Sequence, residues 1–144
     1  MDTKIDFKNP EFYENRELSW IKFDNRVLSE ARDKSIPLLE RLKFVSITSS
    51  NLDEFFMVRV ASLLDMVHAN YKKRDIAGMT ATEQLAAINK ETRELVDTQY
   101  STYTRSLVPL LNKEGIYLVD EHETLTDEQA ALVDRYSMES GYPV

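Results

Sequence analysis

The sequence of 144 residues contains no cysteine, three glycines and four prolines. Without cysteine the chain has neither a disulfide framework nor a thiolate metal site, which is typical of proteins in a reducing cytosol. The glycines stand at positions 78, 115 and 141, too far apart to form a GxGxxG turn or a GxxxxGK(S/T) phosphate loop. Low glycine and proline content, with abundant Leu, Glu, Lys, Arg and Ala, favours helices over strands and turns.

The sequence also lacks an apolar run long enough to span a membrane, and its first residues are charged rather than apolar. Acidic residues outnumber basic ones by 25 to 18, which leaves a net charge of −7. Such a chain is poorly suited to holding nucleic acid or a phosphate chain by itself, because that binding depends on clustered Lys and Arg. We therefore expect a cytoplasmic protein with no transmembrane segment and no nucleic-acid partner.

What is present is a series of helical patterns. The first is predicted to begin after Asn15, a favoured capping residue, with Glu17 near its positive end. A second is expected after Ser35 as its cap, with Pro37 in its first turn, where a missing N–H does no harm. The residues expected on their buried faces are Trp20, Phe23, Val27 and Ala31 in the first helix, and Leu38, Leu39, Leu42 and Val45 in the second.

A third helix is expected to begin near Asn51. It is apolar around most of its circumference, which predicts a central place in a bundle. After a loop that contains Gly78, Thr80 and Glu83 form a capping-box pattern. The apolar spacing that follows predicts a helix of about 30 residues with a kink near Pro109, ending at Gly115.

The last part of the chain has a different character. The run IYLV at 116–119 is β-prone, and Thr126 with Gln129 predicts one more helix. Because so short a segment cannot bury a core alone, we assign residues 1–113 to a helical domain and 114–144 to the beginning of a truncated second domain. The predicted fold is mainly α: an antiparallel bundle of about four helices, followed by a short β/α start.

The stretch SSNLDEFF, at the expected start of the third helix, has two interpretations. Asn51 can cap that helix and Glu54 can complete a capping box, while Asp53 and Glu54 face the positive end of the helix dipole. Alternatively, the amide of Asn51 has donors left over that suit the ring nitrogens of a purine. A phosphate is disfavoured there, because Asp53 and Glu54 would repel it. The two interpretations stay open on these residues alone.

Other chemically active residues have simpler explanations. His68 is expected to face solvent, and His122 lies in the acidic segment DEHE, where carboxylates favour its charged form. The basic residues Lys72, Lys73 and Arg74 are interpreted as a solvated loop. Arg59 is expected to pair with a carboxylate. Trp20 lies at helical spacing, so its first interpretation is a core residue, and an adenine-stacking platform is the second.

Three long motifs in register add a resemblance to a known family. They are NRELSWIKFDNRVLSEA, PLLERLKFVSITSSNLDEFFMVRVASL and LNKEGIYLVDE, within a match that spans about Asn15 to Val144. They resemble the N-terminal region of bacterial polyphosphate kinase, the type with phospholipase-D-like C-terminal domains. In that family the asparagine of the NLDEF motif contacts the ATP adenine, which implies the same role for Asn51. Ser50, Asp53, Glu54 and Arg59 would support it.

The resemblance implies an enzyme that transfers the terminal phosphate of ATP reversibly to inorganic polyphosphate through a phosphohistidine. The catalytic histidines and the magnesium site would lie in C-terminal domains, so no catalytic, cofactor or metal residue is expected in this segment, which alone would be inactive. Mg²⁺ with ATP, ADP and polyphosphate would bind the full-length enzyme, which the family implies to be a homo-oligomer through its other domains.

Two other functions fit the residues. A helical docking module with no nucleotide role would expose apolar surface at its interface. A histidine phosphotransfer bundle would use a surface histidine such as His68, but the glycine-bearing pattern expected after such a histidine is missing.

Overall fold

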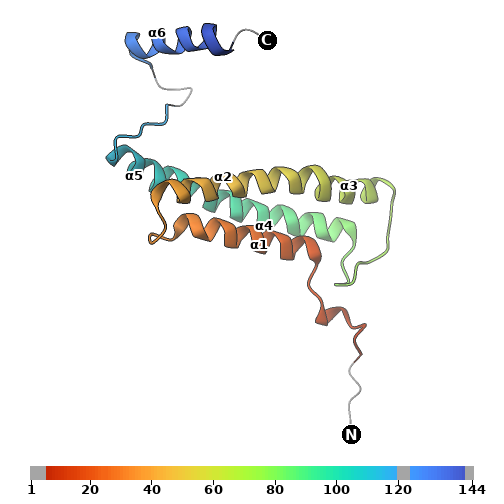
Figure 1. The fold of residues 1–144 in the computed structure, drawn as a ribbon. Coiled ribbons are helices and arrows are strands. Elements are labelled where there is room, and N and C mark those ends of the chain that lie inside the picture. The colour runs from red at the N-terminus through yellow and green to blue at the C-terminus, as the bar shows by residue number, and fades with distance from the viewer. Residues whose placement is uncertain (1–5, 120–123, 142–144) are drawn as a thin grey trace.

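Three long helical segments pack side by side in an up-down-up arrangement in the computed structural model, which describes residues 6–119 and 124–141 (Figure 1). The first is α1 (Arg16–Arg32). The second joins α2 (Leu38–Glu54), a π-helical segment η2 (Phe55–Val60) and α3 (Ala61–His68) without a break. The third joins α4 (Ala81–Thr102), the π-helical η3 (Tyr103–Leu107) and α5 (Val108–Lys113). The mainly α prediction is confirmed.

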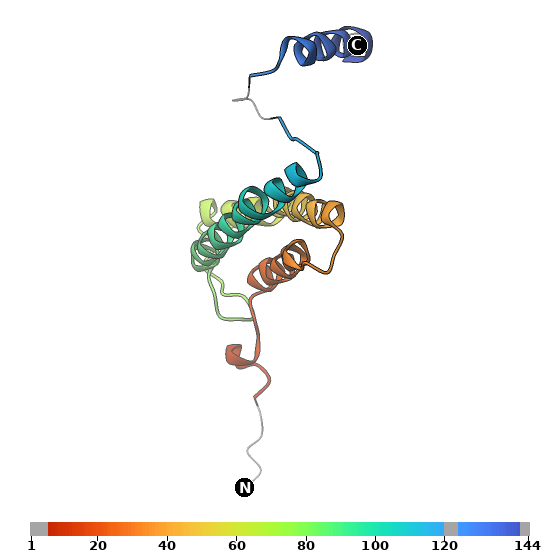
Figure 2. The ribbon, with the colours of Figure 1, turned by 90° about the vertical axis from the view of Figure 1, so that its left-hand side faces the viewer.

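The remaining helices lie outside this bundle. A single turn of 3-10 helix, η1 (Pro10–Phe12), precedes it, and α6 (Asp127–Tyr136) with η4 (Ser137–Gly141) follows. Figure 2 shows the N-terminal lead-in and α6 on opposite sides of the three packed segments. No residue of α6 is buried. The β-prone run at 116–119 forms no strand, because a strand needs a partner and no other strand occurs among residues 6–119 and 124–141.

The core lies between the three segments. Its buried apolar side chains come from each of them: Ile21, Leu28, Ala31, Val45, Leu52, Phe55, Val60, Leu63, Ala81, Ile88, Leu95 and Leu107. The buried face of α1 also carries Glu17 and Asp24 and is offset by about one residue from the predicted face. Trp20 and Val27 are consequently half-buried, and Phe23 is 47% exposed. Ala31 is buried as predicted.

The cap residues were predicted with mixed success. Asn15 caps α1 by accepting hydrogen bonds from the backbone N–H groups of Glu17 and Leu18, and Thr80 forms the predicted capping box with Glu83. Ser35 does not cap α2, which begins one residue after Pro37. The backbone N–H of Ser35 instead donates to the carboxylate of Asp33 at 2.8 Å.

The predicted helix start at Asn51 is wrong, because Asn51 lies three residues inside the end of α2 and the helical backbone continues through it. Val45, Thr48, Leu52 and Phe55 form an unbroken buried face across this point. The hydroxyl of Thr48 donates to the carbonyl of Phe44 within the helix rather than capping a new one. With no glycine or proline to break the backbone, continued burial extends one helix through both predicted ones.

The glycines act where the sequence predicted, and the helix type changes just before Pro109. The π-helical segment η3 ends two residues before Pro109, whose missing N–H removes one bond of the helical ladder. Gly78 and Gly115 adopt φ values of +79° and +78°, in the left-handed region that favours glycine. Gly78 lies in the loop between α3 and α4, and Gly115 follows the end of α5. Within the described ranges, no helix is long and apolar enough to cross a membrane.

Candidate ligand-binding cleft

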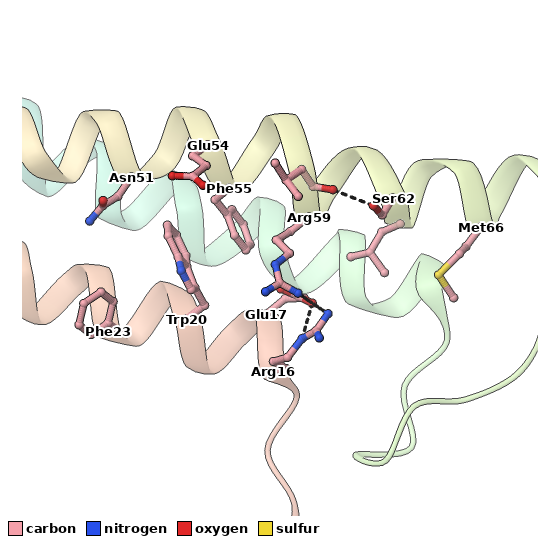
Figure 3. Close-up of a pocket in the computed structure, with 12 residues that line it drawn as sticks. Arg16, Glu17, Trp20, Phe23, Asn51, Glu54, Phe55, Arg59, Ser62 and Met66 are labelled. Atoms are coloured by element: carbon pink, nitrogen blue, oxygen red, sulfur yellow. Dashed lines mark hydrogen bonds and ion pairs between the residues drawn. The ribbon is translucent and has the colours of Figure 1, made fainter.

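A cleft of about 440 Å³ opens between α1 and the continuous α2–α3 segment (Figure 3). Its size falls within the range of small-molecule sites, roughly 300 to 1,000 Å³. One wall comes from α1 and the other from the end of α2, η2 and α3. The lining residues are Arg16, Glu17, Trp20, Phe23, Asn51, Glu54, Phe55, Val58, Arg59, Ser62, Leu63 and Met66.

Asn51 lies at one end of this cleft, opposite Phe23 (Figure 3). Its side chain is half-buried, and Nδ2 donates a hydrogen bond to Oδ1 of Asp24 at 2.8 Å. This bond fixes the orientation of the amide and uses one of its two N–H groups. The second N–H and the carbonyl oxygen have no bonded partner in the part of the chain that the structure describes, so both remain for a ligand.

Asp24, which holds Asn51, is fully buried on α1. Its other oxygen, Oδ2, has no hydrogen-bond partner among the described residues. Burial raises the pKa of this carboxyl, and the hydrogen bond from Asn51 opposes that rise. A buried carboxylate with a single side-chain donor is costly, so the bond to Asn51 is important for both residues.

Aromatic rings form the middle of the cleft. Trp20 of α1 stacks on Phe55, with ring centroids 4.3 Å apart and planes 5° from parallel. Phe55 is buried and Phe56 meets it edge-on at 5.9 Å. Because Phe55 fixes one face of the indole, Trp20 packs against the core and is also part of the cleft wall. Phe23, predicted to be buried, instead exposes its ring at the cleft.

The other end of the cleft is charged but balanced. The buried carboxylate of Glu17 accepts from Arg16 at 2.7 Å and lies 3.9 Å from Nη1 of Arg59 (Figure 3). The prediction that Arg59 pairs with a carboxylate is confirmed. Two arginines and the carboxylates of Glu17 and Glu54 line the cleft, so it has no net positive charge to attract a phosphate. This composition suits a neutral aromatic ligand better.

The residues predicted to support Asn51 are only partly brought together. Glu54 and Arg59 line the cleft, whereas Ser50 and Asp53 are exposed and lie outside its lining. The argument from a helix dipole at Asp53 and Glu54 is wrong, because no helix begins there.

The remaining predicted residues lie away from the cleft. His68 is exposed at the end of α3, and His122 lies outside the described residues. Lys72 and Lys73 are exposed in the loop, as expected, and Arg74 there pairs with Glu83 at 3.0 Å. Among residues 6–119 and 124–141, no group of three His, Asp or Glu side chains is placed to hold a metal ion.

The sequence did not indicate a role in the site for Arg16, Glu17 and Phe23, which line the cleft, or for Asp24, which holds Asn51. Glu17 and Asp24 are seven residues apart and share the face of Ile21 and Leu28, a spacing visible in the sequence. Apolar periodicity passes over them because they are acidic. A search for carboxylates in register with a buried face would have found both.

The fold and the cleft define a helical domain with a small-molecule-sized site between two of its segments. A model of the polyphosphate kinase N-terminal domain matches residues 13–119. The polyphosphate kinase of Lactiplantibacillus plantarum is 50% identical over 139 residues, which covers 96% of this chain and 19% of that protein. The Bacillus anthracis polyphosphate kinase is 47% identical over 141 residues, covering 97% of this chain and 20% of the relative.

A solved structure gives the same result. The crystal structure of polyphosphate kinase from Porphyromonas gingivalis is 31% identical, with a TM-score of 0.70 over 90% of this chain and 18% of that chain. The chain therefore belongs to the polyphosphate kinase family and corresponds to its N-terminal domain. It spans about one fifth of the length of these relatives.

Proposed function

We propose that this chain is the adenine-contacting domain of an ATP:polyphosphate phosphotransferase, with Asn51 as the residue that reads the base. The observation that carries the proposal is the position of Asn51. Its amide is held by Asp24 at 2.8 Å and still has one donor and one acceptor without a described partner, at the end of a cleft walled by aromatic rings. A purine edge presents a matching acceptor and donor, and its faces suit an aromatic wall.

The bond-making steps belong to other parts of the full-length enzyme. In this proposal the terminal phosphate of ATP passes reversibly to inorganic polyphosphate through a phosphohistidine, and Mg²⁺ accompanies ATP in the domains that carry that histidine. The cleft described above supplies orientation of the base rather than chemistry, because both of its arginines pair with Glu17 and Glu54 adds a second negative charge to its lining. The isolated chain should therefore make no polyphosphate.

Residues 114–144 are proposed as the start of the second, or head, domain. Helix α5 ends at Lys113, and Gly115 turns the backbone with φ +78°. Beyond that turn α6 has no buried residue, and Leu132, Val133 and Tyr136 are all more than half exposed. Amide hydrogen exchange of the chain should show protection in the bundle and little in α6; equal protection in both would place α6 in the first domain.

The nucleotide role can be tested with the chain itself, because its single tryptophan lines the cleft. Adenosine and ATP should both change the fluorescence of Trp20, whereas inorganic tripolyphosphate should not. Asn51→Ala should weaken the response to adenosine by about tenfold, the value of a buried directional hydrogen bond. A response to tripolyphosphate equal to that of ATP would mean that the cleft does not read the base.

A second measurement separates the base contact from a loss of structure. In a full-length enzyme that carries this domain, Asn51→Ala should raise the KM for ATP while phosphohistidine still forms, and Ser50→Ala, one residue away and exposed, should leave KM unchanged. An unchanged KM in the Asn51 variant would remove this residue from the site.

The alternative is a helical docking module with no nucleotide role. It is favoured by exposed apolar side chains of η2 that do not line the cleft, where Met57 is 71% exposed and Phe56 43%. Under this alternative, adenosine would leave both the fluorescence and the amide resonances around Asn51 unchanged, and Met57→Gln would abolish association of the chain with the rest of the enzyme.

A further inference from the structure

A second pocket, separate from the cleft, lies where α1 leads into α2 and α4 continues into η3. The three segments meet at this end of the bundle (Figure 1). The pocket has a volume of about 500 Å³ and is lined by Arg32, Lys34, Arg41, Asp97, Thr98, Ser101, Thr102, Arg105 and Ser106. Four of these residues are cationic and one is acidic, in a chain whose net charge is −7. We call it the basic pocket.

Arg41 is the buried member of this set, with 4% of its surface exposed. Its Nε donates to the carbonyl of Ala31 at 2.8 Å and its Nη2 to the hydroxyl of Ser106 at 3.3 Å. In residues 6–119 and 124–141 no carboxylate lies within ion-pair distance of this guanidinium. A buried charge without a counter-ion has a large desolvation cost, and an anion bound beside it would offset that cost.

The third guanidinium nitrogen of Arg41, Nη1, is available to such an anion. It has no bonded acceptor in the described part of the chain. It is also not fully enclosed, because the only fully enclosed side-chain atoms without a partner among the described residues belong to Asp24 and Thr92. Nη1 is therefore open to the basic pocket that Arg41 lines. Two of the three nitrogens are fixed by protein acceptors, which orients the third and reduces the entropy lost on binding.

The hydroxyl groups around the basic pocket differ in what they can offer. Ser106 accepts from Arg41, so its own hydrogen can be donated to a ligand. The hydroxyls of Thr98 and Thr102 already donate to the carbonyls of Glu94 and Thr98, at 2.8 and 2.7 Å. Among these three side chains, Ser106 is thus the free neutral donor, and it stands beside the buried cation.

Exposed cations surround this centre. Arg32 lies in the last turn of α1, Lys34 in the α1–α2 connection and Arg105 in η3. All three are exposed. The opposing charges are Asp97 on the pocket wall and Asp33 nearby, whose pKa is lowered first by hydrogen bonds from Ser35 and less by the charge of Arg41. Four cations against these two carboxylates leave a net positive pocket, which attracts a multiply charged anion.

We propose that the basic pocket binds a phosphate-class anion, with Arg41 and Ser106 as its inner donors and Arg32, Lys34 and Arg105 as its outer cations. Guanidinium groups match the paired oxygens of a phosphoryl group, and hydroxyls complete its coordination. Inorganic phosphate, the end of a phosphate chain and the phosphate of a nucleotide share this chemistry. The expectation that the chain has no polyanion site was based on net charge, which does not register a local cluster. This proposal does not depend on the role of Asn51.

The test is a titration of the isotope-labelled 144-residue chain with inorganic phosphate, tripolyphosphate and AMP, each at constant ionic strength with chloride as the balancing anion. Amide resonances around Arg41 and Ser106 should shift in a saturable way, and those around Asn51 should not for the two inorganic anions. The strongest of the three ligands identifies the source: a single phosphate group, a phosphate chain or a nucleotide. The absence of saturable shifts near Arg41 with all three would overturn the proposal.

Two charge-matched double variants make the test specific. Arg32→Gln with Arg105→Gln removes two outer cations and leaves Arg41 intact, because removing Arg41 would also leave the carbonyl of Ala31 without a donor. Affinity for the best ligand should fall by about fivefold or more, the combined value of two exposed charge contacts. The control, Arg26→Gln with Lys113→Gln, changes net charge equally at exposed positions outside the pocket and should leave affinity within about twofold. An equal loss in both double variants would show non-specific attraction and overturn the site.

Discussion

The amide of Asn51 and the carboxylate of Asp24 are joined by a 2.8 Å hydrogen bond that connects α2 to α1 beside the cleft. Asp24 is fully buried, and its second oxygen has no partner in the described part of the chain. One bond therefore orients the candidate ligand-binding amide and satisfies one oxygen of a buried carboxylate. A change at either residue affects both the cleft and the stability of the domain.

Asn51→Ala should destabilise the chain by about 1 to 3 kcal/mol at neutral pH, because it leaves Asp24 with no side-chain donor. Urea unfolding would measure this. Ser50→Ala, on the exposed side of the same helix, should change stability by less than about 0.5 kcal/mol. In an Asp24→Asn background the cost of Asn51→Ala should shrink, since no buried charge remains; an unchanged cost would show that the two residues are not coupled.

The pH dependence of stability should report the burial of Asp24. Burial raises the pKa of this carboxyl above its ordinary value of 3.8, so the folded chain holds the proton more tightly than the unfolded chain. Its contribution to stability is therefore greatest below 3.8 and is lost as the pH rises through the raised pKa.

Asp24→Asn removes this titration. The stability of the variant relative to the unchanged chain should increase between about pH 4 and the raised pKa, and then stay constant. Urea midpoints measured from about pH 3 to about pH 8 would show the change. Asp33 and Glu83, whose pKa values are lowered, titrate in both proteins and cancel in the difference. A difference that does not vary with pH would contradict the burial of a charge at Asp24.

Asn15 should be among the most sensitive polar positions. Its side-chain oxygen Oδ1 caps α1. Its Nδ2 donates to Asp75 at 2.6 Å and to Gln84 at 2.9 Å, and these bonds connect the loop before α4 and the first turn of α4 to the start of α1. Asn15→Ala should cost about 2 to 3 kcal/mol through the lost cap and the unpaired buried acceptors. Asn9→Ala, which removes the cap of the exposed η1 turn, is the matched control and should cost less than about 1 kcal/mol in thermal unfolding.

Gly78 and Gly115 provide a matched pair. Their φ values are nearly equal, at +79° and +78°, but a Cβ on Gly78 would lie 3.3 Å from Cβ of Pro10, whereas a Cβ on Gly115 would meet nothing within 4 Å. Gly115→Ala should cost about 1 kcal/mol from backbone strain alone. Gly78→Ala should cost more, and the excess measures the contact with Pro10. Equal losses of melting temperature would mean that the lead-in does not hold Pro10 against this loop.

The sequence predicted best those features that are set by local chemistry. The structure contains the predicted caps at Asn15 and Thr80 and the predicted turn at Gly78. Each of these features involves only residues within a few positions of it in the sequence. The capping interpretation of Asn51 failed because the same side chain has a tertiary partner, Asp24, 27 residues earlier. A cap pattern does not reveal whether the helix before it ends, since that depends on burial against other segments.

The two pockets differ in the same way. The resemblance to a family implies a ligand contact for Asn51, but the other wall of its cleft comes from α1, where the sequence predicts a buried Phe23. The basic pocket joins residues from 32 to 106, and no short motif contains them. Such a site depends on how distant helices are brought together, which neither spacing nor total charge records.

The π-helical segment η2 has a geometric consequence for the cleft. The lining residues Asn51, Phe55, Arg59 and Leu63 follow one another at intervals of four. In a regular α-helix each such interval advances around the axis by roughly 40° beyond a full turn, so the row would wind away from α1. The wider turns between Phe55 and Val60 take up part of that rotation. Deleting one residue from this segment would leave the chain helical but rotate Leu63 away from α1. The cleft would then be shorter at the Leu63 end, while Asn51 would keep its position.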